Sequence, residues 1–281
     1  MLNHLHSIDS LPKRVVVVGA AGFVGSTIAQ HLKVQGVEVL LISRTEVDLL
    51  DDQAHYKLAR YLRDTDCVIA TAAIAPCTSS DMLVDNLRIA RCMIHAFNLA
   101  KVSHVINISS DAVFMDSMSP LTEDSHLAPD TTHGVMHLAR EIIFRSELLV
   151  PLAILRPSLL YGEHDPHNGY GPNRFRRLAQ INADIVLFGE GEELRDHVDV
   201  EDLARVVVNC TMRGSTGALT IATGQVVSFK EIANLMVKKH RSKSKIFFSQ
   251  RISPMPHNGY RAFDIRSLRI AFPDFKFSSL L

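Results

Sequence analysis

The sequence predicts an α/β protein, a doubly wound parallel sheet followed by a small C-terminal lobe. The four consecutive valines after Arg14 form an uninterrupted β-branched run, which is typical of a strand buried on both faces. Gly19, Gly22 and Gly25 follow this strand at once and lead into an apolar helical pattern. Strand and helix patterns then alternate as far as about residue 157, and this alternation favours a parallel sheet with crossover helices.

The later elements of the core follow from hydrophobic periodicity. The strands predicted after the glycines are 37–42, 67–70, 102–108 and 152–155, and the helices predicted between them are 53–62, 81–100 and 133–149. Residues 13–160 are therefore expected to form the sheet domain. Residues 1–12 are expected to be a loose extension, in which His4 and His6 are unordered.

The composition of the chain changes after about residue 157. Residues 161–172 are rich in Gly, His, Pro and Asn, and long irregular segments of this kind often carry function. A helix is predicted at Phe229–Lys239. We expect residues 161–281 to form mainly the lobe, with segments that return to the core.

Charge and composition exclude several classes of partner. The chain has 281 residues, of which 30 are basic and 30 acidic, so nothing suggests a nucleic-acid partner. No apolar run reaches the roughly 18 to 20 residues of a membrane span. The four cysteines form no CxxC pair, which favours reduced structural thiols and a cytoplasmic protein.

The glycine loop indicates a dinucleotide-binding site. Gly19 permits a tight turn, Gly22 lets the backbone approach a pyrophosphate, and Gly25 lets the helix pack closely on the strand. The N-terminus of that helix, at Phe23 and Val24, receives the negative charge of the phosphates. A glycine triplet alone is weak evidence, but its place between a strand and a helix makes it specific.

The end of the second strand predicts which dinucleotide is bound. A carboxylate there would bind the ribose 2′-hydroxyl of NAD, whereas this strand ends at Ser43 and Arg44. A guanidinium offers planar donors to a 2′-phosphate, so NADP is preferred over NAD. The alternative is that Arg44 is a solvated surface cation. Ala72, in the small-residue segment that closes the third strand, leaves room for the cofactor.

Five motifs together resemble the extended short-chain dehydrogenase/reductase family, in its nucleotide-sugar epimerase, dehydratase and reductase branch. They are GAAGFVG, ATAA, INISSDAVF, LRPSLLYG and FGEGEELRDHVDVEDLA, and the resemblance covers roughly residues 14–275. It implies a Rossmann-type domain with a substrate-binding lobe. It also implies hydride transfer with NAD(P) on a nucleoside-diphosphate sugar. A homodimer is expected from the resemblance, through helices 81–100 and 133–149.

The resemblance also implies roles for individual residues. Ser110 matches the catalytic serine or threonine, which hydrogen-bonds the substrate hydroxyl or carbonyl. Arg195 matches an arginine that often grips the substrate diphosphate, although a structural salt bridge is the alternative. Asn173 lies at the start of a helix expected beside the nucleotide.

The sequence departs from the family pattern at its catalytic pair. The family has Tyr-x-x-x-Lys on the helix before the fifth strand, whereas this chain has His133 and His137, with Gly134 and Glu141 matching. A histidine can perform acid/base chemistry near neutral pH, so His133 is the candidate acid/base. His137 could touch the cofactor ribose but brings no fixed positive charge. Two alternatives stay open. Histidines spaced i and i+4 can bind zinc as a pair, but no third ligand is evident, so no metal is predicted. The other alternative is a protein that binds the dinucleotide without turnover.

Overall fold

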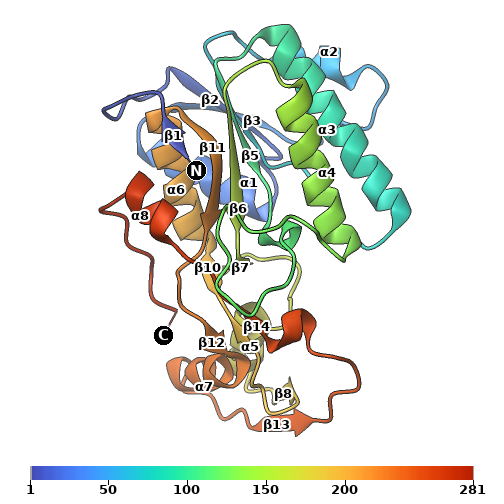
Figure 1. The fold of residues 1–281 in the computed structure, drawn as a ribbon, viewed down its shortest axis with the longest axis vertical. Coiled ribbons are helices and arrows are strands. Elements are labelled where there is room, and N and C mark those ends of the chain that lie inside the picture. The colour runs from blue at the N-terminus through green and yellow to red at the C-terminus, as the bar shows by residue number, and fades with distance from the viewer. Residues whose placement is uncertain (1, 281) are drawn as a thin grey trace.

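A computed structural model describes residues 2–280 and shows one large sheet with helices on both faces (Figure 1). Six strands run parallel in the order β11-β6-β5-β4-β2-β3, and a short antiparallel strand, β1, flanks β11. The strands are β2 (Arg14–Val18), β3 (Glu38–Ile42), β4 (Cys67–Ala70), β5 (His104–Ile108), β6 (Leu152–Pro157) and β11 (Ser215–Ile221). The predicted α/β class and the predicted strands of the core are confirmed.

Each face of the sheet is covered by its own set of helices. Alternate valines of β2 point to opposite faces, so Val15 and Val17 enter one hydrophobic cluster while Val16 and Val18 enter another. The first cluster contains helices α1 (Phe23–Val34) and α6 (Val200–Arg213), and the second contains α2 (Ala54–Ala59), α3 (Ser80–Ala100) and α4 (Thr132–Glu147). Both layers are therefore held by continuous apolar packing.

The N-terminal segment is not the loose extension that the sequence predicted. Asn3–His4 forms β1, which pairs with β11, and Leu2 is buried. His4 is ordered, because its ring nitrogens lie 2.8 Å from Ser215 Oγ and 3.0 Å from the Ala271 carbonyl oxygen. The prediction failed because a two-residue edge strand leaves no periodic signal in the sequence.

The lobe lies below the sheet in the view of Figure 1. Its helices are α5 (Pro172–Gln180) and α7 (Phe229–Lys239), which pack around Phe175 and Phe229, and α7 has the predicted bounds. Its short strands are β8 (Ile185–Phe188), β9 (Leu194–Arg195), β12 (Val227–Ser228), β13 (Ile246–Ser249) and β14 (Tyr260–Arg261). The strands β7 (Leu159–Tyr161) and β10 (His197–Asp199) pair with each other, and the turn η2 (Pro256–Gly259) and the helix α8 (Arg266–Ala271) follow towards the end of the chain.

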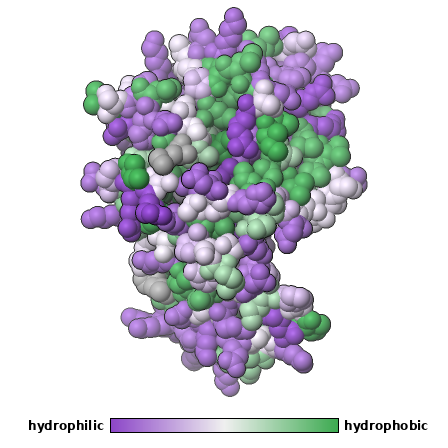
Figure 2. All heavy atoms as spheres, in the orientation of Figure 1, coloured by the Kyte–Doolittle hydropathy of each residue, from purple (hydrophilic) through white to green (hydrophobic). Residues whose placement is uncertain are grey.

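The surface of α3 and α4 is partly apolar. Figure 2 shows hydrophobic side chains gathered over these two helices, and Val84, Leu99, Val135 and Ile142 are exposed there. Within residues 2–280, every helix is too short or too polar to cross a lipid bilayer.

Candidate functional site

The glycine loop lies where the strand order changes direction. The chain passes from β2 to its neighbour β3 on one side and then returns to β4 on the other side of β2. The connections that leave the carboxyl ends of β2 and β4 therefore run in opposite directions. Open α/β sheets bind ligands at such a switch point. Gly19 follows β2 here, and the segment Thr71–Ala73 follows β4.

The three glycines are required by the packing of the loop. Gly19 has a φ of +93°, and a Cβ there would lie 2.6 Å from the Ala72 nitrogen. A Cβ on Gly25 would lie 2.3 Å from the Gly19 carbonyl oxygen, while one on Gly22 would lie 3.3 Å from the same atom. The loop therefore holds its tight shape only without these side chains, as a cradle for a phosphate group requires.

Helix α1 begins directly behind the loop with unused donors. Its N-cap is Gly22, which has no side chain to accept from the first-turn N–H groups. The ring of Phe23 packs near Gly162, and Val24 packs against the core. Phe23 and Val24 can therefore offer their backbone N–H groups, rather than their side chains, to a bound anion.

A cavity of about 410 Å³ opens beside the loop. Its walls are formed by the loop, by Ile42–Arg44 after β3, and by the small residues 71–75 after β4. These residues fit the adenosine half of a dinucleotide, because the cavity is mostly apolar, is bordered by free helix donors and is not filled by side chains.

The mouth of this cavity carries charges that the sequence analysis only partly identified. Arg44 Nε lies 2.8 Å from Asp48 Oδ2, and the Arg44 side chain is 82% exposed. Ser43 donates to Glu46 from both its backbone N–H and its hydroxyl, at 2.8 and 2.5 Å, and these hydrogen bonds lower the pKa of Glu46. The Glu46 carboxylate was missed because it lies beyond the strand end and is folded back onto it.

Ser110 is positioned by the start of a 3₁₀ turn, η1 (Asp111–Val113). Its hydroxyl accepts a hydrogen bond from the Ala112 N–H at 3.1 Å and is half-buried. Helix α4 approaches this turn closely, because a Cβ on Gly134 would lie only 2.2 Å from the Ala112 carbonyl oxygen. Gly134 thus brings the element that carries Ser110 against the element that carries His133.

His133 and His137 lie on the same side of α4. Their rings meet edge to face, with centroids 4.7 Å apart. His133 Nδ1 accepts a hydrogen bond from the Cys77 backbone N–H at 3.3 Å, so the neutral ring carries its proton on Nε2. Burial lowers the pKa of His133, and burial together with His133 and Arg140 lowers that of His137 well below its ordinary value. Both rings are therefore held neutral.

The sequence from β2 into β11 matches a known family model. Residues 15–218 match the model of the NAD dependent epimerase/dehydratase family. The chain belongs to this family.

The chain is also similar to curated proteins, among them a reductase and a synthase. The chain is 27% identical to dTDP-4-dehydro-6-deoxy-D-allose reductase of Streptomyces bikiniensis over 267 residues, which cover 80% of each protein. It is 23% identical to GDP-L-fucose synthase of Escherichia coli K12 over 269 residues, which cover 84% of each protein.

Solved structures of other family members share the fold. UDP-N-acetylglucosamine 4-epimerase of Bacillus cereus superposes with a TM-score of 0.80 at 23% identity, covering 96% of this chain and 92% of that one. UDP-glucuronic acid 4-epimerase of Bacillus cereus, solved with UDP-glucuronic acid and NAD, gives a TM-score of 0.78 at 21% identity and covers 95% of both chains. The chain thus shares its overall fold, the Rossmann-type sheet with its lobe, with these solved structures.

Two residues predicted to bind substrate make structural contacts in this family member. Arg195 is 3% exposed, and its Nη2 lies 2.8 Å from Glu193 Oε2 and contacts the Pro256 carbonyl oxygen. Asn173 is buried, and its Oδ1 accepts from the Gly162 N–H at 3.0 Å. The salt-bridge alternative for Arg195 therefore describes the contacts that its side chain makes.

Further charged residues meet where the lobe adjoins the core. Arg261 Nε lies 2.7 Å from Asp111 Oδ2, next to Ser110, and Arg261 Nη1 lies 2.9 Å from Asp116. Arg251 pairs with Glu193 as well. The sequence analysis missed these arginines because Arg251 lies in the irregular segment after β13 and Arg261 at its far end, where no periodic pattern marks a site.

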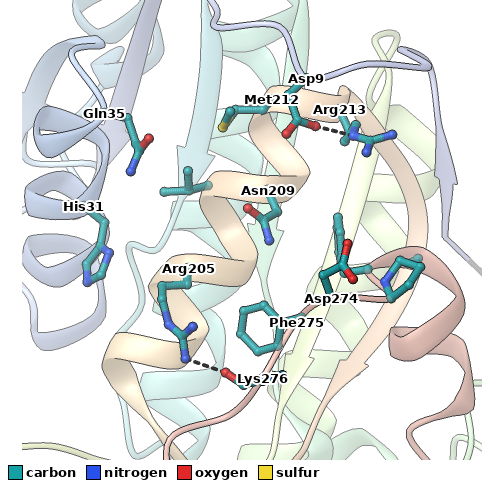
Figure 3. Close-up of a pocket in the computed structure, with 14 residues that line it drawn as sticks. Asp9, His31, Gln35, Arg205, Asn209, Met212, Arg213, Asp274, Phe275 and Lys276 are labelled. Carbon is teal, nitrogen blue, oxygen red and sulfur yellow. Dashed lines mark hydrogen bonds and ion pairs between the residues drawn. The ribbon is translucent and has the colours of Figure 1, made fainter.

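Another hollow, larger than the cavity beside the loop, lies away from this site. It measures about 610 Å³ and is bordered by α1, α6 and the C-terminal segment (Figure 3). Arg213 already pairs with Asp9 in it, and Arg205 donates to the Lys276 carbonyl oxygen at 2.8 Å. We therefore place the functional site at the glycine loop and α4. Residues 2–280 contain no group of three or more His, Cys, Asp or Glu side chains that could hold a metal ion.

Proposed function

We propose that the protein is an NADP-dependent oxidoreductase or epimerase that acts on a nucleoside-diphosphate sugar by hydride transfer. The observation that carries the proposal is the hydrogen bond from the Cys77 N–H to His133 Nδ1, 3.3 Å long. It orients a neutral imidazole with its Nε2–H free, on the helix that faces Ser110. A bound nicotinamide dinucleotide would supply the hydride, and the side chains of His133 and Ser110 would hydrogen-bond the oxygen on the reacting carbon.

His133 acts in this scheme as a hydrogen-bond donor. A protonated ring would place an Nδ1–H against the Cys77 N–H, so the cationic form is disfavoured by geometry as well as by burial. A neutral Nε2–H polarises a carbonyl oxygen in the way an oxyanion-hole donor does. The Ser110 hydroxyl would supply a second hydrogen bond, and the alkoxide left by hydride addition takes its proton from water. This arrangement favours the reduction of a sugar ketone over the deprotonation of an alcohol, and one curated relative is named as a dehydro-deoxy-sugar reductase.

NADP is the proposed cofactor because of Arg44. Its guanidinium is 82% exposed at the mouth of the adenosine cavity and is tethered by Asp48, which orients it without burying it. A 2′-phosphate would gain a planar, charged donor there.

We also propose that the substrate is a sugar nucleotide held between Ser110 and the lobe, and that two copies of the chain associate through α3 and α4. The exposed Ile142 on α4 supports this interface. In sedimentation velocity, Ile142→Glu should yield a monomer, whereas the matched lobe variant Val186→Glu should stay dimeric.

The buried, unpaired cysteines Cys67 and Cys210 fit a reducing, cytoplasmic location.

The test of the function is single-turnover hydride transfer with a panel of 4-keto and 4-hydroxy sugar nucleotides. His133→Ala should slow the reaction at least about 100-fold, because one positioned donor is lost. His133→Gln, which keeps an N–H donor, should retain part of the rate, and the remote variant His95→Ala should match the wild type. Cofactor binding without turnover on any substrate would instead establish a non-catalytic dinucleotide-binding protein.

A further inference from the structure

Arg140 of helix α4 is a buried cation with no carboxylate partner among residues 2–280. It is 1% exposed, and its one hydrogen bond runs from Nη2 to the Ala72 carbonyl oxygen, at 2.9 Å. Its Nε and Nη1 have none. By contrast, the buried Arg14 and Arg156 each pair with a carboxylate at 2.7 Å. An unpaired buried charge is costly, and such groups concentrate at functional sites.

The position of Arg140 links the two halves of the candidate site. It follows His137 by three residues and His133 by seven, so all three lie along one face of α4. Its guanidinium holds the carbonyl of Ala72, whose nitrogen would lie 2.6 Å from a Cβ on Gly19. The charge therefore lies between the glycine loop and the two histidines.

The neighbouring charged groups already have partners of their own. Glu141 is bound by Arg156 of β6 and by Arg145, and Asp111 of η1 is bound by Arg261. Asp85 of the adjacent helix α3 pairs with Arg88. The electrostatic effect of His167 falls on His133, whose pKa it lowers in addition to the effect of burial. None of these described groups neutralises Arg140, so its field reaches the site.

We propose that Arg140 supplies the fixed positive charge of the dinucleotide site. A lysine at position 137 would otherwise bring such a charge, and His137 does not. In this role Arg140 is a positioning residue. It adds to the effect of burial that keeps His137 neutral, it attracts the anionic dinucleotide, and it disfavours the cationic oxidised nicotinamide relative to the reduced one. The cofactor part of the inference rests on the proposed function, while the effect on His137 belongs to the protein alone.

The first experiment measures the titration of His137 by NMR in the cofactor-free protein. Arg140→Gln keeps a donor for Ala72 but no charge, Arg140→Lys keeps the charge, and Arg145→Gln removes an exposed cation from the same helix. The pKa of His137 should rise by about one unit in Arg140→Gln and stay unchanged in the other two. A wild-type titration in Arg140→Gln would overturn the proposal.

The second experiment measures the dissociation constants of NADP⁺ and NADPH by calorimetry, with NAD⁺ and NADH in parallel. The ratio of oxidised to reduced dissociation constants should fall about tenfold in Arg140→Gln and in Arg140→Met, and hold in Arg140→Lys. An unchanged ratio would count against Arg140 whatever the enzyme's activity.

The stability of Arg140→Met separates this role from a structural one. Removing an unpaired buried charge should leave the melting temperature equal or higher, whereas a structural arginine would lower it. Failure of the proposed function is distinguishable, because it appears as absent turnover while the titration and the cofactor ratio still respond to Arg140.

Discussion

Glu141 receives two hydrogen bonds from the guanidinium of Arg156, 2.9 and 2.7 Å long, and a third from Ser109 at 2.6 Å. Glu141 is fully buried and Arg156 nearly so. This pair fixes the register of α4 on β6, and α4 carries His133 two turns earlier. The structure of the site thus depends on an ion pair that touches no substrate.

We expect Glu141→Gln to lower the free energy of unfolding by about 3 to 5 kcal/mol, because it leaves the Arg156 charge buried without its partner. The measurement is urea unfolding at neutral pH, with Glu147→Gln at the end of the same helix as control. A loss below about 1 kcal/mol would show that the pair is not a structural clamp.

Arg44 and Asp48 should set the cofactor preference in opposite directions. Arg44→Ala should remove the preference for NADPH over NADH. Asp48→Asn should tighten NADPH a few-fold, because it removes a carboxylate that competes with the 2′-phosphate for the same guanidinium. Dissociation constants from fluorescence titration test both. Identical preferences in the wild type and Arg44→Ala would exclude Arg44 from recognition.

The reductive hydride-transfer rate should be flat between pH 6.5 and 8. Burial lowers the pKa of His133 from its ordinary value of 6.5, so the neutral ring with its Nε2–H donor is the predominant form over this range. A histidine acting as a cationic acid would instead lose rate as the pH rises through its pKa. Single-turnover pH profiles decide, and a tenfold fall per unit within this range would contradict the donor role.

His197 should make the fold acid-sensitive. Burial lowers its pKa from 6.5 to about 4. The unfolded chain therefore binds a proton more readily, and stability present above pH 6.5 is lost as the pH falls towards 4. His197 lies beside the Phe229 ring, and His197→Phe should make the acid-induced fall in the free energy of unfolding smaller by about 3 kcal/mol. Urea unfolding of the wild type and of the variant at pH 6.5 and pH 4 tests this prediction. An equal fall in the free energy of unfolding in both proteins would refute it.

The sequence predicted the elements that periodicity encodes. Five parallel strands of the core and α7 are found where the pattern placed them, whereas β11 was not predicted. Gly19, which was predicted to permit a tight turn, has a φ of +93°. Helix ends shifted by one to three residues, because capping side chains such as Thr131 decide them locally.

The site was less predictable, because its decisive contacts join distant segments. Nothing near Arg195 in the sequence shows that it would meet the Pro256 carbonyl, and nothing near Arg140 shows that it would reach Ala72. The tautomer of His133 depends on the backbone of Cys77, 56 positions away. Such contacts follow from topology, and a residue pattern does not contain them.

The pairing of β1 with β11 has a consequence for how the chain reaches this structure. His4 and Ser215 are 211 positions apart, yet they meet at the edge of the sheet. The first strand therefore cannot pair until the last core strand has been synthesised, so the part of the lobe from α5 to β10 is made before that edge closes, and the rest of the lobe follows β11. Until then the open edge can recruit strands from other chains, so aggregation during synthesis competes with its closure.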